Sequence, residues 1–185
     1  IDATLETYDI PIVFRQSNKS KDFIAQAEGE EQTANSFIMI GNILHQVFSN
    51  IQTADDIPQV LDRFEQDGIL YGEDLNREKL QKMLSEYIST NEMVADWFSP
   101  HWKLYNECSI LTTDKNTGEV CERRPDRVMK DGNRVVVVDF KFGKMNDKYI
   151  DQVREYMQLL RNMGYSDIKG FLWFVRKGTI KEVTL

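Results

Sequence analysis

Three side chains near the middle of the chain could together handle a phosphate. Asp139 and Lys141 end the apolar run that begins at Val135, and Asp126 follows a proline one predicted hairpin earlier. Two carboxylates a few ångströms apart repel each other unless a cation lies between them, and hard oxygen ligands suit Mg²⁺ or Mn²⁺. Because strand side chains alternate with a period of two, Lys141 shares a face with Asp139, where it could stabilise charge on a phosphate or help to orient an attacking water.

Ordinary surface chemistry is the alternative for these residues. Asp126 could be a turn acid that pairs with Arg124 or Arg127, and Asp139 and Lys141 could form a plain surface ion pair. Surface pairs contribute little to stability and need no buried strand behind them. The position of Asp139 and Lys141 at the end of an apolar run therefore favours a site.

Three predicted strands position these residues. A period of two indicates strands at residues 103–112, 119–129 and 134–140. The pair Asp131-Gly132 predicts a hairpin turn between the last two. Pairing about this turn places Arg124 opposite Asp139 and Asp126 on a diagonal, within reach of the same site if the strand bends at Pro125.

Helices are predicted before and after these strands. Apolar residues recur at spacings of three and four in the first half of the chain and again after the third strand. The predicted helices cover residues 36–51, 56–68, 76–88, 93–98 and 148–163, and two final strands cover 169–175 and 179–184. The predicted fold class is therefore α/β, with a central mixed sheet, flanking helices and an N-terminal helical extension.

The length and composition predict one principal domain. A chain of 185 residues, of which 41% are hydrophobic, can bury a real core. We interpret residues 1–35 as an arm or linker from an upstream region and residues 36–185 as one domain, helical over 36–99 and sheet-containing over 100–185. No apolar run approaches the ~20 residues that span a bilayer, so no membrane partner is expected. The first residue, Ile1, suggests a piece of a longer polypeptide.

The charge is unevenly distributed. The formal net charge of −7 argues against a general nucleic-acid coat protein. Residues 123–161, however, contain ten Lys and Arg against six Asp and Glu, a balance of +4. A basic strip beside a few acids is what a metal-dependent enzyme acting on a polyanion would need, although a solvated helix face would have the same charge.

Four motifs carry a family resemblance. Pro125-Asp126 followed by Asp139-Phe140-Lys141 resembles the PD-(D/E)xK nuclease signature, a short pattern that is weak alone. Upstream, GNILH at 41–45 resembles the G-x-x-x-H element of RecB-type nucleases, and downstream QVREY at 152–156 resembles their Q-x-x-x-Y element. The four motifs follow the family's order on the expected elements.

The resemblance implies a restriction-endonuclease-like core and a Mg²⁺-dependent DNA nuclease of exonuclease type, in which Mn²⁺ can substitute for Mg²⁺. His45, Asp126 and Asp139 match the family's metal ligands, with the backbone carbonyl of Phe140 as a further ligand. Lys141 matches the catalytic lysine. A lone histidine beside an apolar helix face is usually a core residue, and the other motifs favour His45 as a ligand.

Other positions are implied more loosely. Gln152 and Tyr156 match residues that line the site and the DNA path, and their spacing of four places both on one helix face. Tyr156 also fits the inward apolar stripe and could be core. Glu107 falls where related nucleases often carry an extra acid on the first strand. A position in solvent, without a role in the site, agrees with the sequence about equally well. Candidate phosphate contacts are Arg124, Arg127, Lys144 and Lys148.

The cysteine count selects a branch of the family. Cys108 and Cys121 cannot supply a four-thiolate cluster, so no iron–sulfur cluster is expected. In the cluster-free branch the nuclease is commonly the C-terminal domain of a helicase–nuclease that resects double-strand breaks. The chain has no G-x-x-x-x-G-K-[ST] motif and therefore no nucleotide-hydrolysing P-loop of its own. The resemblance implies a motor upstream in the full-length chain, with a second subunit as a further candidate partner. The resemblance implies a single-stranded DNA end as substrate and a bacterial, cytoplasmic, nucleoid-associated location.

Two other functions compete with this prediction. One is a catalytically silent copy of the fold that binds DNA or a partner subunit. Such a copy has no chemical need of Asp139 and Lys141 together. The other is an enzyme on an unrelated fold that hydrolyses a different phosphate ester.

Overall fold

The computed structural model of the chain describes residues 31–70, 76–106, 108–113, 118–143 and 145–185. The chain divides into two compact units, residues 1–38 and 39–185. Helix α2 (Glu31–Asn50) begins in the first and continues into the second, starting five residues earlier than its apolar periodicity predicts. The predicted arm, residues 1–35, lies mostly outside the described residues.

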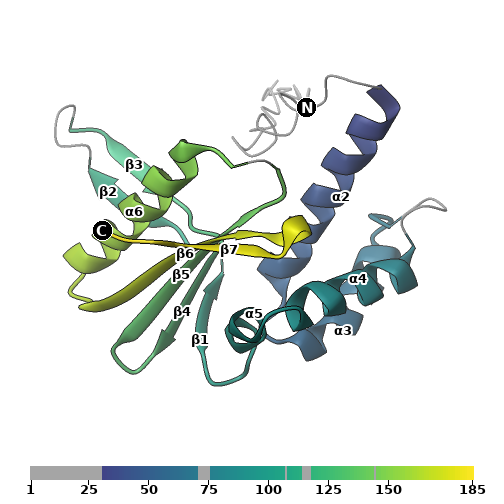
Figure 1. Cartoon of the computed structure of the whole chain (residues 1–185), viewed down its shortest axis with the longest axis horizontal. Helices are drawn as coiled ribbons and strands as arrows, with labels where there is room; N and C mark the ends of the chain where they lie inside the picture. The colour runs from purple at the N-terminus through teal and green to yellow at the C-terminus, as the bar shows by residue number, and fades with distance from the viewer. Residues whose placement is uncertain (1–30, 71–75, 107, 114–117, 144) are drawn as a thin grey trace, which may run out of the picture. The chain divides into compact units, whose positions relative to one another are not determined.

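The second unit is built on a five-stranded sheet in the order β1-β4-β5-β6-β7 (Figure 1). Its strands are β1 (Lys103–Asn106), β4 (Arg127–Asp131), β5 (Arg134–Lys141), β6 (Asp167–Phe174) and β7 (Thr179–Val183). β5 and β6 run parallel, with α6 (Asp147–Asn162) connecting them, and the other neighbours are antiparallel. The prediction of a mixed sheet with flanking helices is confirmed.

Two predicted strands are each broken into two pieces. The strand expected at 103–112 divides into β1 and β2 (Ile110–Thr113), and the strand expected at 119–129 divides into β3 (Val120–Arg123) and β4. β2 and β3 pair with each other in a separate two-stranded sheet. The second break falls at Pro125, which has no N–H to donate to a ladder. The break leaves Asp126 in a bend just before β4 begins.

The register of β4 and β5 differs from the prediction by two residues. Arg127 pairs with Val138 and Asp131 with Arg134, so that Gly132 and Asn133 form the turn. Gly132 has a φ of 55°, in the left-handed region that glycine adopts without strain. The expected pairing of Arg124 with Asp139 is therefore wrong. Continuing the observed register by one residue instead places Asp126 level with Asp139.

The remaining predicted helices are confirmed, with small shifts at their ends. They are α3 (Ile57–Gln66), α4 (Arg77–Ser89), α5 (Glu92–Trp97) and α6, with short 3₁₀ turns η1 (Ala54–Asp56) and η2 (Val175–Lys177). Asparagines fix three of the starts, because the side chains of Asn76, Asn91 and Asn146 each accept a hydrogen bond from a first-turn N–H. In the described part of the chain, no helix combines the length and apolar character required to cross a membrane.

Helix α6 covers one face of the sheet. Val135 and Val137 of β5 pack with Val153, Tyr156 and Leu160 of α6 in one buried cluster. The approach is closest at Gly170 of β6, where an added Cβ would meet the Sδ atom of Met157 and lie 2.8 Å from Cγ1 of Val153. The small residue on β6 therefore sets how close α6 lies to the sheet.

An aromatic cluster fills the opposite face. Phe48 of α2 packs on Phe140 of β5 and Trp173 of β6, with ring centroids 5.3 and 5.2 Å apart. Trp97 and Phe98 join this cluster and are buried, as is Trp102. These three aromatic residues therefore belong to the core.

Candidate active site

Asp126 joins two elements that are far apart in the sequence. Its Oδ1 lies 3.0 Å from Nε2 of His45 on α2, and its Oδ2 accepts a hydrogen bond of 2.8 Å from the backbone N–H of Phe140 on β5. The residue is 1% exposed. Asp126 is therefore a buried residue that contacts both α2 and β5, and it is not an exposed turn acid.

His45 lies at the edge of the buried stripe of α2. Leu44, Val47 and Phe48 face the core, and the histidine side chain, 18% exposed, borders them. Its ring meets the ring of Phe140 edge-on, with centroids 6.4 Å apart. The imidazole therefore has one side against the core and one nitrogen against a carboxylate, an arrangement that a metal-ligating histidine shares.

Asp139 and Lys141 form a buried ion pair at the end of β5. Nζ of Lys141 lies 2.6 Å from Oδ2 of Asp139, and the two side chains are 8% and 0% exposed. The ammonium also lies 4.2 Å from the ring centroid of Tyr149 on α6. Because β5 alternates, both side chains continue the face of Val135 and Val137 that packs against α6. The pair is thus held inside the fold, and the surface ion pair considered from the sequence is wrong.

A chain of polar contacts extends from this ion pair along α6. Nζ of Lys141 donates to Oε1 of Gln152 at 3.3 Å, and Nε2 of Gln152 donates to the hydroxyl of Tyr156 at 2.6 Å. That hydroxyl donates to the carbonyl oxygen of Arg124 at 3.3 Å. Burial, reinforced by the negative charge of Asp139, raises the pKa of Tyr156 above its usual range. The phenol therefore remains protonated and links α6 to the loop that precedes Asp126.

The types of donor atom at the site suit a divalent metal ion. Their positions form only part of a metal-binding arrangement. Two buried carboxylates, an imidazole and the carbonyl of Phe140 are oxygen and nitrogen donors of the kind that bind Mg²⁺ or Mn²⁺. Within the described ranges, no group of three or more His, Cys, Asp and Glu side chains is arranged to hold an ion. The residue types fit a divalent ion, whereas the arrangement brings His45 and Asp126 into direct contact and leaves Asp139 paired with Lys141.

Two predicted phosphate contacts are exposed, and two predicted residues cannot be placed. Arg124 precedes the site and is 55% exposed, with Nη2 3.5 Å from Glu122, and Lys148 is exposed in the first turn of α6. Both side chains are accessible to a nucleic acid, and their role stays a prediction. Glu107 and Lys144 lie outside the described residues.

The assignment of Arg127 as a phosphate contact is wrong. The residue is 0% exposed, and its guanidinium donates hydrogen bonds to main-chain carbonyl oxygens of Ile51, Gln52 and Trp97. It also stacks 4.2 Å from the ring centroid of Phe98, and burial lowers its pKa to about 9. The sequence contained a signal that Arg127 could be buried. Because strand side chains alternate, Arg127 and the buried Met129 fall on the same face of β4.

Tyr149 is the site residue that the sequence reasoning missed. It lies under the ammonium of Lys141 and is buried. Its position three residues before Gln152 places both on one face of α6, which is the signal that could have identified it.

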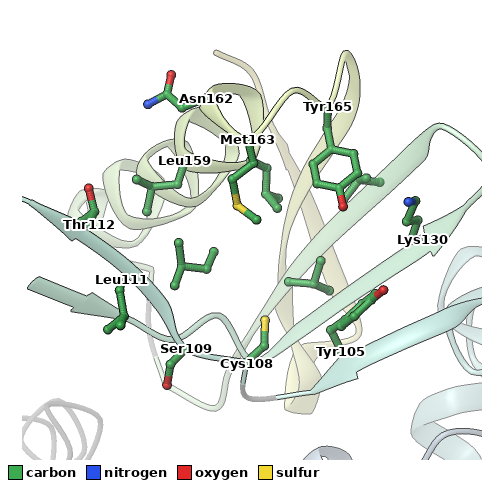
Figure 2. A pocket seen from close by; sticks show the side chains of 14 residues that line it. Tyr105, Cys108, Ser109, Leu111, Thr112, Lys130, Leu159, Asn162, Met163 and Tyr165 are labelled. Atoms are coloured by element: carbon green, nitrogen blue, oxygen red, sulfur yellow. The ribbon is translucent and has the colours of Figure 1, made fainter.

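A separate pocket of about 480 Å³ lies at the other end of α6 (Figure 2). It is lined largely by apolar groups from β2, the start of β5 and the end of α6, and its residues include Tyr105, Cys108, Lys130, Leu159, Met163 and Tyr165. Among the predicted site residues that the structure describes, none lines it. The candidate active site is therefore a buried polar network at the end of β5, distinct from this pocket.

The model of the PD-(D/E)XK nuclease superfamily matches residues 20–184. The chain therefore belongs to this superfamily, whose members are generally metal-dependent nucleases. Its mixed sheet and flanking helices form a restriction-endonuclease-like fold. A search of curated proteins gave no match.

Proposed function

We propose that this domain is a Mg²⁺-dependent deoxyribonuclease of the RecB type that hydrolyses phosphodiester bonds. The observation that carries the proposal is the convergence of three segments on one network. Asp126 contacts His45 of α2 and the N–H of Phe140 on β5, and Lys141 of β5 contacts the Gln152 side chain of α6. Each contact joins residues of a different motif in the family's order.

His45, Asp126, Asp139 and the carbonyl of Phe140 are the residues that would hold the metal. A bound divalent ion supplies Lewis-acid stabilisation of the phosphate and lowers the pKa of a bound water. The protein contributes a site from which water is largely excluded, since both carboxylates are buried. In such surroundings electrostatic interactions are stronger than in bulk water.

Lys141 is proposed to stabilise negative charge on the reacting phosphate. Asp139, Gln152 and the ring of Tyr149 hold its ammonium at the end of β5. A donor fixed before reaction stabilises developing charge without reorganisation at the moment of bond cleavage. Gln152 is in turn oriented by the protonated hydroxyl of Tyr156. These two residues therefore act by orienting Lys141.

The biological setting is proposed from the motif pattern. The G-x-x-x-H and Q-x-x-x-Y elements support membership of the branch that works within helicase–nucleases. In this setting residues 36–185 form the nuclease domain, a motor upstream in the full-length chain delivers a single-stranded DNA end, and a second subunit completes the enzyme. Exonucleolytic resection at double-strand breaks in the bacterial nucleoid is the corresponding role.

One observation favours the rival function, a silent copy of the fold that binds DNA or a subunit. Asp126 and Asp139 already have internal partners in His45, the N–H of Phe140, and Lys141. A fold that had lost catalysis could retain such a network for stability. Metal binding separates the two functions, because a silent domain needs no Mn²⁺ affinity that depends on Asp139.

The test is cleavage of end-labelled single- and double-stranded DNA in Mg²⁺, Mn²⁺ or EDTA. Asp139→Asn and Lys141→Met should abolish cutting while the domain remains folded by circular dichroism. Asp151→Ala is the matched control, since this exposed acid of α6 contacts Arg154 and lies outside the network. Cleavage that persists in Asp139→Asn, or a folded wild type that neither cuts DNA nor binds Mn²⁺, would overturn the proposal.

A further inference from the structure

The half-buried Asn106 and the buried Arg127 hold the C-terminal end of α2. Asn106 of β1 and Arg127 of β4 are cross-strand partners, and together they form what we call the carbonyl clamp. Nδ2 of Asn106 donates to the carbonyl oxygens of Ser49 at 2.9 Å and Ile51 at 3.3 Å. Arg127 donates to Ile51 at 3.0 Å and to Gln52 at 2.7 Å. The sheet thereby supplies the donors that the end of the helix lacks.

The clamp matches the electrostatics of a helix end. The last carbonyls of a helix have no intrahelical partner, and the C-terminal end of a helix carries partial negative charge. A guanidinium satisfies both needs through charge-assisted hydrogen bonds. Arg127 also donates to the carbonyl of Trp97 at the end of α5, at 2.9 Å, so it joins two helices to one strand.

The clamp borders the candidate active site at both ends. On the strand, Arg127 directly follows Asp126. On the helix, the Ser49 hydroxyl donates to the carbonyl oxygen of His45 at 2.9 Å, one turn before the clamped carbonyls. The clamp is therefore one residue from Asp126 at the start of β4, and about one helical turn from His45 on α2.

We propose that Arg127, assisted by Asn106, is a positioning residue that sets the geometry of His45 against Asp126. This inference rests on the proposed function, in which these two side chains are metal ligands. The His45–Asp126 contact joins residues 81 positions apart in the sequence. Arg127 fixes the same two elements to each other, and its loss allows α2 to shift along β4. Arg127 acts through the ligands, because its guanidinium is buried and cannot touch a substrate.

The test is to measure Mn²⁺ binding by isothermal titration calorimetry in the absence of DNA. Arg127→Met replaces the guanidinium with an apolar side chain and should raise the Mn²⁺ dissociation constant by about 10-fold, as loss of residues that orient metal ligands does. Arg127→Lys, which keeps the charge but not the fork of donors, should recover part of the affinity. Leu84→Ala in α4 is the control, since it weakens a distant core position and should leave the Mn²⁺ affinity unchanged.

Double mutants distinguish positioning from stability. If Arg127 acts through His45, adding Arg127→Met to His45→Ala should change the Mn²⁺ dissociation constant by less than about 2-fold, because the affected ligand is already gone. Equal effects in both backgrounds, or no effect of Arg127→Met on affinity, would overturn the inference. If Arg127→Met does not fold, the same comparison with Asn106→Ala decides.

The two proposals can fail separately. A wild type that binds Mn²⁺ and cuts DNA, together with an Arg127 variant of unchanged affinity, contradicts the positioning role alone. A folded wild type that neither binds Mn²⁺ nor cuts contradicts the nuclease function. In that case urea denaturation of the metal-free variants still tests positioning, and additive losses from Arg127→Met and His45→Ala contradict it.

Discussion

Replacing Lys141 with Met tests whether the ion pair at the end of β5 is a structural requirement as well as a catalytic one. Met retains most of the length of the side chain and removes the ammonium that lies 2.6 Å from Asp139. The carboxylate of Asp139 is fully buried and cannot turn to bulk water. We therefore expect the variant to fold with reduced stability and to lose DNA cleavage.

The size of the stability loss follows from the burial of both partners. Removing one partner of a buried pair costs about 3–5 kcal/mol, because a buried charge is left uncompensated. Asp139→Asn removes that charge, so the double variant Lys141→Met/Asp139→Asn should regain most of the loss. The coupling energy between the two positions should therefore be at least as large as the part of the loss that the double variant regains.

Mn²⁺ should compensate for the missing ammonium. A divalent ion at Asp139 restores positive charge, so urea denaturation with Mn²⁺ at about 100 times its dissociation constant should stabilise Lys141→Met by about 2.7 kcal/mol. At any one Mn²⁺ concentration the gain should exceed that of the wild type, where Lys141 competes for Asp139. DNA cleavage should remain absent. Ordinary surface substitutions change the unfolding free energy by no more than about 0.5 kcal/mol. If metal-free Lys141→Met lies within that range of the wild type, the reasoning about the buried ion pair is refuted.

Three further predictions concern α6 and the loop before Asp126. Gly170→Ala should lower the unfolding free energy by about 1–3 kcal/mol in urea denaturation, because the new Cβ would lie 2.8 Å from Val153; an unchanged midpoint would contradict the close approach. The raised pKa of Tyr156 means that above pH ~10 the unfolded chain loses a proton which the folded chain retains, so stability falls by about 1.4 kcal/mol per pH unit. Tyr156→Phe should lack this loss, which denaturation at pH 9, 10 and 11 measures, and equal slopes in both proteins would contradict it. Arg124→Ala should reduce the slope of log affinity for DNA against log salt concentration by about one, as measured by fluorescence anisotropy in EDTA, whereas an unchanged slope would exclude a phosphate contact.

The helices were predictable because their signals are local. Asn76 and Pro58 fix the starts of α4 and α3 through capping and backbone restriction, which depend on neighbouring residues alone. The order of strands and helices followed from periodicity for the same reason. The motif residues were correctly placed near the end of β5 and on α6.

The register and the role of Arg127 were not predictable in the same way. Placing the turn at Gly132-Asn133 rather than at Asp131-Gly132 shifts the pairing by two residues, and both dipeptides are plausible turns. The three carbonyls that Arg127 satisfies come from residues 76, 75 and 30 positions away, so no local pattern reveals them. A basic residue beside a predicted site suggests a phosphate contact, whereas the fold uses Arg127 as an internal donor.

The contacts of the network differ widely in the length of chain that separates their partners. Lys141 and Gln152 are 11 residues apart, within one strand–helix unit, whereas His45 and Asp126 are 81 apart. Closing the longer loop costs more conformational entropy before its contact is gained. During folding the Lys141 side of the site can therefore assemble first, and the His45–Asp126 contact must wait until α2 has docked on the sheet. On the proposed function, an incompletely folded chain holds its catalytic lysine without a finished metal site and cannot cut the DNA around it.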